Sequence, residues 1–287
     1  MIPTRSLRTV VAERLERQDW ASLLRGEIGV LRIPGYLPAA QREAAVTRLY
    51  AGPHFEAYDP IDECGGIDPV AHRQIRSDLL EGSTPDHPPV TRRLGRTLYE
   101  YAVRDKPEEY FRVAGDFDDA RRALFPTGED VIDNVLALIS EVTGAPASVA
   151  EEPGYGRCYA GVIREVHGRS RLHTDDAREE TPGFRLGALP WQLGLYVILD
   201  MPERGGDMIV YEREYRPDDR SFRQGYGLDP RAVAGDGYIG IAPRPGDLIL
   251  FPDRNIHRVD ACSGDGRRIK LQAHLGVDTD GSVSCWS

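Results

Sequence analysis

The second half of the chain is a series of short apolar segments separated by turn residues, and this pattern limits the possible folds more than any other feature. From residue 157 onward, runs rich in Val, Ile, Leu, Tyr and Phe alternate with clusters of Gly, Pro and Asp. The runs predicted to be strands are residues 158–166, 192–199, 208–212, 237–241, 248–251, 256–259 and 268–275. Many short strands with turns between them are typical of sandwiches and barrels. We therefore predict a mainly β fold with flanking helices (α+β), built on a double-stranded β-helix, the cupin-like jelly-roll.

The first half of the chain predicts helices that pack on this core. A strand is expected at residues 27–36, and residues 59–68 have the composition of a loop. Apolar residues recur at helical spacing over residues 6–25, 38–50, 70–80, 90–103 and 129–143. No linker-like segment separates the halves, so we expect one domain over residues 1–287, mainly helical over 1–150 and jelly-roll over 151–287.

Charge and composition exclude several classes of protein. The net charge of −10 argues against a nucleic-acid-binding surface, which needs a basic face. The chain has no apolar run long enough to cross a membrane, and its first residues lack the apolar stretch of a signal peptide. The four cysteines are scattered without a CxxC pair, so reduced thiols in a cytoplasm are the simplest interpretation. We expect a cytoplasmic protein whose partner is a small molecule.

Two histidines and a carboxylate in the β half suggest a metal site. The first pair is in the sequence His173-Thr174-Asp175, and His257 begins a strand that follows a tight turn. A ligand at a strand end is held rigidly, as a metal site requires. Two imidazoles and one carboxylate form the facial donor set of an Fe(II) site, which leaves positions open for a co-substrate and O₂. The neighbouring Asp176 is expected to point away from the metal, because side chains alternate along a strand.

The last predicted strand has one apolar and one polar face. By period-two alternation, the polar face carries Arg268, Lys270, Gln272 and His274. If the strand that carries His257 is a neighbour, this face lines the same cavity as the metal. Arg268 follows His257 by eleven positions, and its planar guanidinium suits a carboxylate. Without the histidines, a solvent-facing edge strand with ordinary charges would be the better interpretation.

Four segments, in the correct order, resemble the prolyl-4-hydroxylase-like branch of the Fe(II)/2-oxoglutarate-dependent dioxygenases. They are residues 161–175, 192–212, 243–259 and, more weakly, 29–37. The resemblance covers residues 157–276 well and residues 50–150 hardly at all. It implies a jelly-roll enzyme that converts 2-oxoglutarate and O₂ to succinate and CO₂ while it oxidises a C–H bond of a second substrate.

The resemblance also implies a role for individual residues. His173, Asp175 and His257 would bind Fe(II), and Arg268 would pair with the distal carboxylate of 2-oxoglutarate. His274 and Gln272 share the polar strand face with Arg268 and are therefore further candidates for the co-substrate site. Related halogenases replace the carboxylate ligand by a small residue so that chloride binds the iron. Because Asp175 is present here, the resemblance implies a hydroxylase of a small molecule, amino-acid-derived or an intermediate in the biosynthesis of a specialised metabolite.

Two long charged segments, residues 177–190 and 213–236, are expected to act as loops over the active site. If they choose the substrate, their arginines are candidates for binding an acidic group: Arg185, Arg213, Arg216, Arg220 and Arg223. The alternative is a solvated, charged loop. Four charged residues of the first half are further candidates for the pocket: Asp62, Glu63, Arg73 and Arg76.

Other functions remain open at this point. A cupin-like metal enzyme that does not use 2-oxoglutarate would keep the histidines and Asp175 but would not need Arg268. A non-enzymatic barrel that binds a small ligand would predict no turnover of 2-oxoglutarate. The sequence does not name the substrate, the carbon that is oxidised, or the oligomeric state, and desaturation, epoxidation or cyclisation would use the same residues as hydroxylation.

Overall fold

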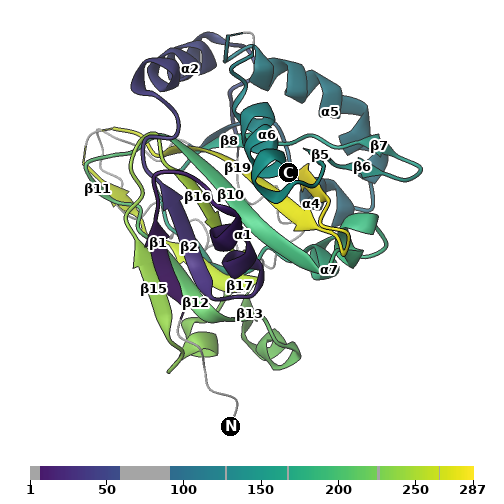
Figure 1. Cartoon of the computed structure of the whole chain (residues 1–287), viewed down its shortest axis with the longest axis vertical. Coiled ribbons are helices and arrows are strands. Elements are labelled where there is room, and N and C mark those ends of the chain that lie inside the picture. Colours follow the sequence, from purple (N-terminus) through teal and green to yellow (C-terminus); the bar gives the residue numbers. More distant parts are fainter. Residues whose placement is uncertain (1–6, 59–90, 127, 167, 225–226, 265) are drawn as a thin grey trace.

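Two facing β-sheets form the centre of the computed structural model, which describes residues 7–58, 91–126, 128–166, 168–224, 227–264 and 266–287 (Figure 1). The larger sheet has the strand order β1-β2-β16-β10-β19-β8-β4-β3, and β20 and β5 continue it from β19. The smaller sheet has the order β15-β12-β17-β9. The predicted jelly-roll core with flanking helices is therefore confirmed.

The strands of the two sheets are β1 (Arg8–Val11), β2 (Ile28–Ile33), β3 (Glu56–Ala57), β4 (Arg92–Leu94), β5 (Ala147–Val149), β8 (Val162–Glu165), β9 (Ser170–His173), β10 (Trp191–Asp200), β12 (Met208–Glu214), β15 (Tyr238–Ile241), β16 (Leu248–Phe251), β17 (Asn255–Val259), β19 (Ile269–Val277) and β20 (Val283–Trp286). Shorter strand pairs are formed by β6 (Glu151–Glu152) with β7 (Gly156–Arg157), β11 (Arg204–Gly205) with β18 (Cys262–Ser263), and β13 (Arg223–Gln224) with β14 (Gly227–Leu228). The helices are α1 (Arg17–Leu24), α2 (Ala39–Ala51), α4 (Leu98–Ala102), α5 (Pro107–Arg122), α6 (Val131–Thr143) and α7 (Ala177–Glu180), with 3₁₀ turns η2 (Arg185–Ala188), η3 (Pro217–Phe222) and η4 (Pro230–Val233).

The central strand β10 shows why the interior has two apolar layers. Its residues are almost all buried, and successive side chains point to opposite faces of the sheet. Leu195 and Val197 pack in the larger core with the helices, whereas Tyr196 and Ile198 pack in a second cluster with residues of the smaller sheet. Figure 1 shows α2, α5 and α6 on one side of β10 and strands β12, β15 and β17 on the other. The space between the sheets is where a functional cavity can form.

Local sequence explains the best-predicted helix. The α6 helix begins after Asp130, whose carboxylate accepts hydrogen bonds from the backbone N–H groups of Ile132 and Asp133. It ends at Gly144, which adopts a left-handed conformation with φ 76°. The expected helix at residues 129–143 therefore forms, with a capping carboxylate at its start and a glycine at its end.

Two of the expected helices begin as strands. Residues 8–11 form β1, which pairs in parallel with β2, and residues 92–94 form β4, which pairs with β8. The β-branched Thr9-Val10-Val11 segment favours a strand, and sheet pairing outweighs a weak helical pattern. The α5 helix was not expected. The predicted loop at 59–68 and helix at 70–80 lie outside the described residues.

No helix within the described ranges combines the length and the apolar composition that a crossing of the bilayer requires.

Candidate metal centre and its cavity

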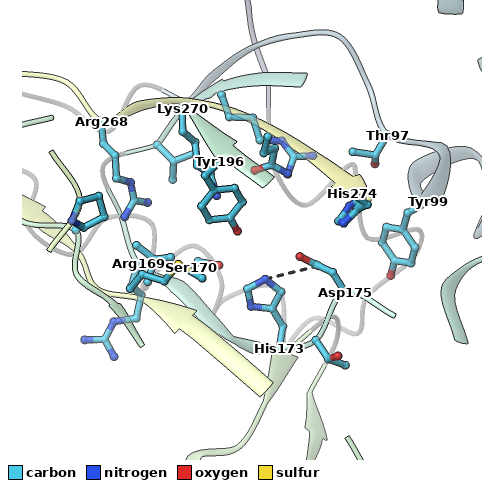
Figure 2. Close-up of a pocket in the computed structure, with 18 of the residues that line it drawn as sticks. Thr97, Tyr99, Arg169, Ser170, His173, Asp175, Tyr196, Arg268, Lys270 and His274 are labelled. Carbon is cyan, nitrogen blue, oxygen red and sulfur yellow. Dashed lines mark ion pairs between the residues drawn. The ribbon is translucent and has the colours of Figure 1, made fainter. Parts of the chain in front are cut away.

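The two histidines and the carboxylate of the sequence pattern lie together between the sheets. His173 ends β9 and is the register partner of His257 on β17, so their ring centroids are 4.2 Å apart. Asp175 follows two residues after His173, and its carboxylate lies 3.7 Å from Nε2 of His173 and 3.4 Å from Nε2 of His257. One ligand atom from each residue lies within 4.8 Å of the others. Figure 2 shows His173 and Asp175 facing each other at the edge of the cavity.

Each imidazole is held in the orientation that a metal ligand needs. Nδ1 of His173 donates to the carbonyl oxygen of Arg171 at 2.6 Å, and Nδ1 of His257 donates to that of Asn255 at 2.9 Å. A carbonyl only accepts, so the proton is on Nδ1 and the lone pair of Nε2 faces the centre of the cluster. Burial, together with the neighbouring ring of His257, lowers the pKa of His173 to about 4, so His173 is neutral at pH 7.

The cluster fits a divalent metal. Among the described residues, Nε2 of His257 is buried and has no hydrogen-bond partner, which is costly unless another group fills that position. Burial raises the pKa of Asp175, but the two imidazoles outweigh that effect and hold the pKa below its usual range. Two imidazoles and one carboxylate on a single side are the donors that non-haem Fe(II) takes, with positions left open opposite them.

Neighbouring residues fix the loop that carries Asp175. Its backbone N–H donates to the carbonyl of Asp253 at 3.1 Å, and its own carbonyl accepts from Nε2 of Gln192 at 2.5 Å. The adjacent Asp176 turns away from the cluster, caps α7 and pairs with Arg254 at 3.4 Å. The orientation of Asp175 is therefore set by both sheets.

A cavity of about 290 Å³ opens beside the cluster and is lined by the polar face of β19. Arg268, Lys270, Gln272 and His274 all face it, as expected from strand alternation. This face reaches the metal cavity in a different way from the predicted one, because β17 does not pair with β19. The two strands belong to different sheets and face each other across the cavity, since a jelly-roll closes its polar interior between its sheets.

Arg268 and Lys270 make one end of the cavity cationic. Arg268 is buried, and its guanidinium donates to the carbonyl oxygens of Gly168 at 2.7 Å and Asp260 at 3.0 Å. Nζ of Lys270 lies 3.8 Å from the ring centroid of Tyr196. Burial lowers the pKa of both cations. A cationic end of this kind suits an anion. Figure 2 shows both cationic side chains across the cavity from His173, with the Tyr196 ring between the cations and His173.

His274 lies at the other end of the same strand. It follows Arg268 by six residues, which is about 20 Å along an extended strand. Its Nδ1 is 2.7 Å from a carboxylate oxygen of Asp253, and Figure 2 places it beside Asp175. Burial lowers its pKa, but the hydrogen bond with Asp253 outweighs that effect and raises it. The structure therefore groups His274 with the metal cluster rather than with Arg268, and Gln272 lies between them, opposite Tyr196 in the register.

Of the five candidate arginines in the two loops, Arg223 lines the cavity. Arg213 is held by Asp219 at 2.7 Å and Asp236 at 2.6 Å, and Arg220 pairs with Glu179 at 3.5 Å. The side chain of Arg185 binds Ser284 at 3.1 Å, and Arg216 precedes η3. The candidates Asp62, Glu63, Arg73 and Arg76 lie outside the described residues.

Several cavity residues were missed from the sequence. They are Thr97, Tyr99, Arg164, Tyr196, Glu179 and Glu180. Tyr196 had a signal, because it shares the even-numbered face of β10 with Ile198, and that face looks toward the smaller sheet. The others lie on separate segments that only the tertiary structure brings together.

The family of the carrier-protein-independent halogenase WelO5 matches residues 70–287 of the chain. An L-gamma-glutamyl-L-propargylglycine hydroxylase of Streptantibioticus cattleyicolor is 29% identical over 284 residues, covering 97% of this chain and 95% of that protein. The leucinostatins biosynthesis cluster protein S of Purpureocillium lilacinum is 32% identical over 146 residues, 48% of this chain and 59% of that protein.

Among solved structures, the fold is similar to that of an N-substituted L-amino acid dioxygenase from Burkholderia ambifaria in complex with alpha-KG. The TM-score is 0.58 at 16% identity, covering 94% of this chain and 90% of that one. The alpha-ketoglutarate-dependent epimerase SnoN of nogalamycin biosynthesis gives a TM-score of 0.50 at 16% identity, covering 91% and 82%. At these identities the likeness concerns the fold alone.

Proposed function

Because the chain belongs to the family of the carrier-protein-independent halogenase WelO5, within the Fe(II)/2-oxoglutarate-dependent oxygenases, we propose that it uses iron and 2-oxoglutarate to hydroxylate an amino-acid-derived small molecule. The observation that carries this proposal is the carboxylate of Asp175 between the Nε2 atoms of His173 and His257. A halogenase needs an open position for chloride where Asp175 stands. The product is therefore an alcohol rather than an organic halide.

Each residue of the site has a role in this proposal. His173, Asp175 and His257 hold the iron, and Arg268 pairs with the distal carboxylate of 2-oxoglutarate. Bound iron and 2-oxoglutarate supply the oxidation, in which O₂ and the ketoacid give succinate, CO₂ and one oxygen atom for the substrate C–H bond. The chain itself positions the reactants and excludes water, because Ile198 and Met208 line the cavity between the sheets.

The substrate class comes from the relative that spans nearly the whole chain. By its name, that protein hydroxylates a γ-glutamyl dipeptide with an unsaturated side chain. We infer a substrate of the same kind, a small γ-glutamyl or related amino-acid derivative, and the size and polarity of the cavity support this class. The narrower resemblance to prolyl 4-hydroxylases rests on the order of four sequence segments and stays a prediction.

A single domain over residues 1–287 is part of the same proposal. Strand β2 pairs with β16, and β4 pairs with β8, so segments of the first half complete the larger sheet. The predicted helical support and the jelly-roll therefore share one core in the described residues. A cytoplasmic location stays a prediction, and so does the expectation that nucleic acids and membranes are not partners.

An anaerobic titration tests the function directly. Metal-free protein receives Fe(II) and then 2-oxoglutarate, and we expect the visible charge-transfer band of an iron-chelated ketoacid. His173→Ala removes one ligand of the facial set, so the band should disappear in that variant. Tight binding of iron by the unaltered protein without any band would exclude 2-oxoglutarate chemistry and favour the cupin-like alternative.

Arg268→Ala should weaken 2-oxoglutarate binding by about 10-fold to 100-fold, the worth of hydrogen bonds to a charged group. Titration of the same band against 2-oxoglutarate measures the change. Arg258→Ala is the matched control, because Arg258 pairs with Asp260 and does not line the cavity. Equal affinities in the two variants would remove Arg268 from the co-substrate site.

A further inference from the structure

Glu180 is a carboxylate in the cavity that the proposed reaction does not use. It ends α7 and lines both the main cavity and a smaller one beside it, which is also lined by His274 and Gln192. Within the described ranges of the chain, its carboxylate makes no hydrogen bond and no ion pair. Burial and then the nearby carboxylates of Asp175 and Asp253 raise its pKa well above the usual range. A recessed carboxylate in this position favours a cationic ligand.

Arg223 is the opposite charge at this end of the cavity. It follows η3, and its guanidinium lies 5.4 Å from the ring centroid of Tyr215, which restricts its position. Its charge is close enough to lower the pKa of Glu180, against the larger effects of burial and the aspartates. Yet no ion pair joins Glu180 and Arg223, two described residues that line the same cavity. A gap therefore separates a carboxylate from a guanidinium, and both face the place where substrate must lie.

Two further cations of the cavity, Arg268 and Lys270, belong to a different end. Arg268 and Lys270 lie at the start of β19, whereas His274, which shares the smaller cavity with Glu180, lies four residues beyond Lys270. Four residues of a strand span about 13 Å. A dicarboxylate at Arg268 thus leaves the region of Glu180 and Arg223 available for a second molecule.

We propose that Glu180 and Arg223 bind the amino-acid head group of the substrate, with Glu180 on the α-ammonium group and Arg223 on the α-carboxylate. This inference rests on the proposed function and adds the substrate class, a compound with a free α-amino group beside a free α-carboxylate. A γ-glutamyl derivative qualifies, because its amide bond uses the side-chain carboxyl group. An N-acylated amino acid lacks the cation that Glu180 requires and should be a poor ligand.

Binding without turnover provides the test. The protein is loaded with Zn(II) and 2-oxoglutarate, and calorimetry measures the affinity for γ-L-glutamyl-L-norvaline, for its N-acetyl form and for its glutamyl α-carboxamide. Glu180→Gln should lower the affinity for the first probe at least about 10-fold. Its affinity for the N-acetyl form, which is already weak, should be unchanged. Arg223→Gln should lower the affinity for the first probe by a similar factor and leave the affinity for the carboxamide unchanged. Exposed charges outside the cavity give the matched controls Glu214→Gln and Arg231→Gln, which should bind as the unaltered protein does.

The outcomes separate this inference from the proposed function. Glu180 is not the ammonium site if Glu180→Gln binds the first probe as well as the unaltered protein does. The same conclusion follows if N-acetylation of the probe lowers its affinity equally for Glu180→Gln and for the unaltered protein. Failure of the unaltered protein to bind the first probe more tightly than its N-acetyl form also overturns the inference. The charge-transfer band with Fe(II) and 2-oxoglutarate should persist in both variants, and its absence from the unaltered protein would instead overturn the function.

Discussion

His257→Ala is expected to lower Fe(II) affinity and 2-oxoglutarate turnover by more than about 100-fold. Loss of a residue that only hydrogen-bonds to a metal ligand already costs up to about 100-fold, and loss of the ligand itself should cost more. His257 is fully buried at the centre of β17, and its Nε2 has no partner among the described residues. The backbone pairing of β17 with β9 and β12 fixes the position of this ligand. Calorimetry with Fe(II) under anaerobic conditions and an assay of succinate release measure the two losses.

The control for this variant is His54→Ala, because His54 is exposed at the surface and lies outside the cavity. It should bind iron and release succinate as the unaltered protein does. Succinate release by His257→Ala within tenfold of the unaltered protein would contradict the facial set. His274 would then have to be considered as a ligand, since it lies beside Asp175 and lines the cavity.

The sequence predicts the jelly-roll and the metal cluster well because both depend on local signals. Strand alternation is a period-two pattern, and the runs at residues 192–199 and 248–251 are close to the observed β10 and β16. His173 and Asp175 are two residues apart, so a single turn places them together. His257 required the longer inference, and its register with His173 is known only from the pairing of β17 with β9.

What the sequence missed has a common physical cause. The buried face of α5 includes Asp118 and Arg121, so an apolar stripe does not mark that helix. The strand β9, which carries His173, is only four residues long and includes Arg171. Glu180 and Arg223 lie in segments with many charges, and nothing local separates a charge in the cavity from one in solvent. Only the packing of α7 and η3 over the sheets does so.

The charge buried in α5 leads to the largest expected effect on stability. The side chain of Arg121 is fully buried, and its guanidinium lies 2.9 Å from a carboxylate oxygen of Asp118 and 3.1 Å from one of Asp130. Asp130 also caps α6 by accepting from two backbone N–H groups. Asp130→Ala removes one of the two carboxylates that pair with the buried Arg121 guanidinium. The same change removes the cap of α6, so its first backbone N–H groups lose their acceptor. We expect the free energy of unfolding to fall by about 3–5 kcal/mol.

Urea denaturation measures this loss, and two further variants divide it into its parts. Asp130→Asn keeps a good cap but removes the charge, so it should recover only about 1 kcal/mol of the loss. Asp133→Ala is the matched control, because the ion pair of Asp133 with Arg122 is substantially exposed, and its removal should cost less than about 1 kcal/mol. If Asp130→Ala were no more destabilising than Asp133→Ala, Arg121 would not depend on Asp130. Because a domain is stabilised by only about 5–15 kcal/mol, the expected loss is a large share of what keeps the helical layer on the jelly-roll.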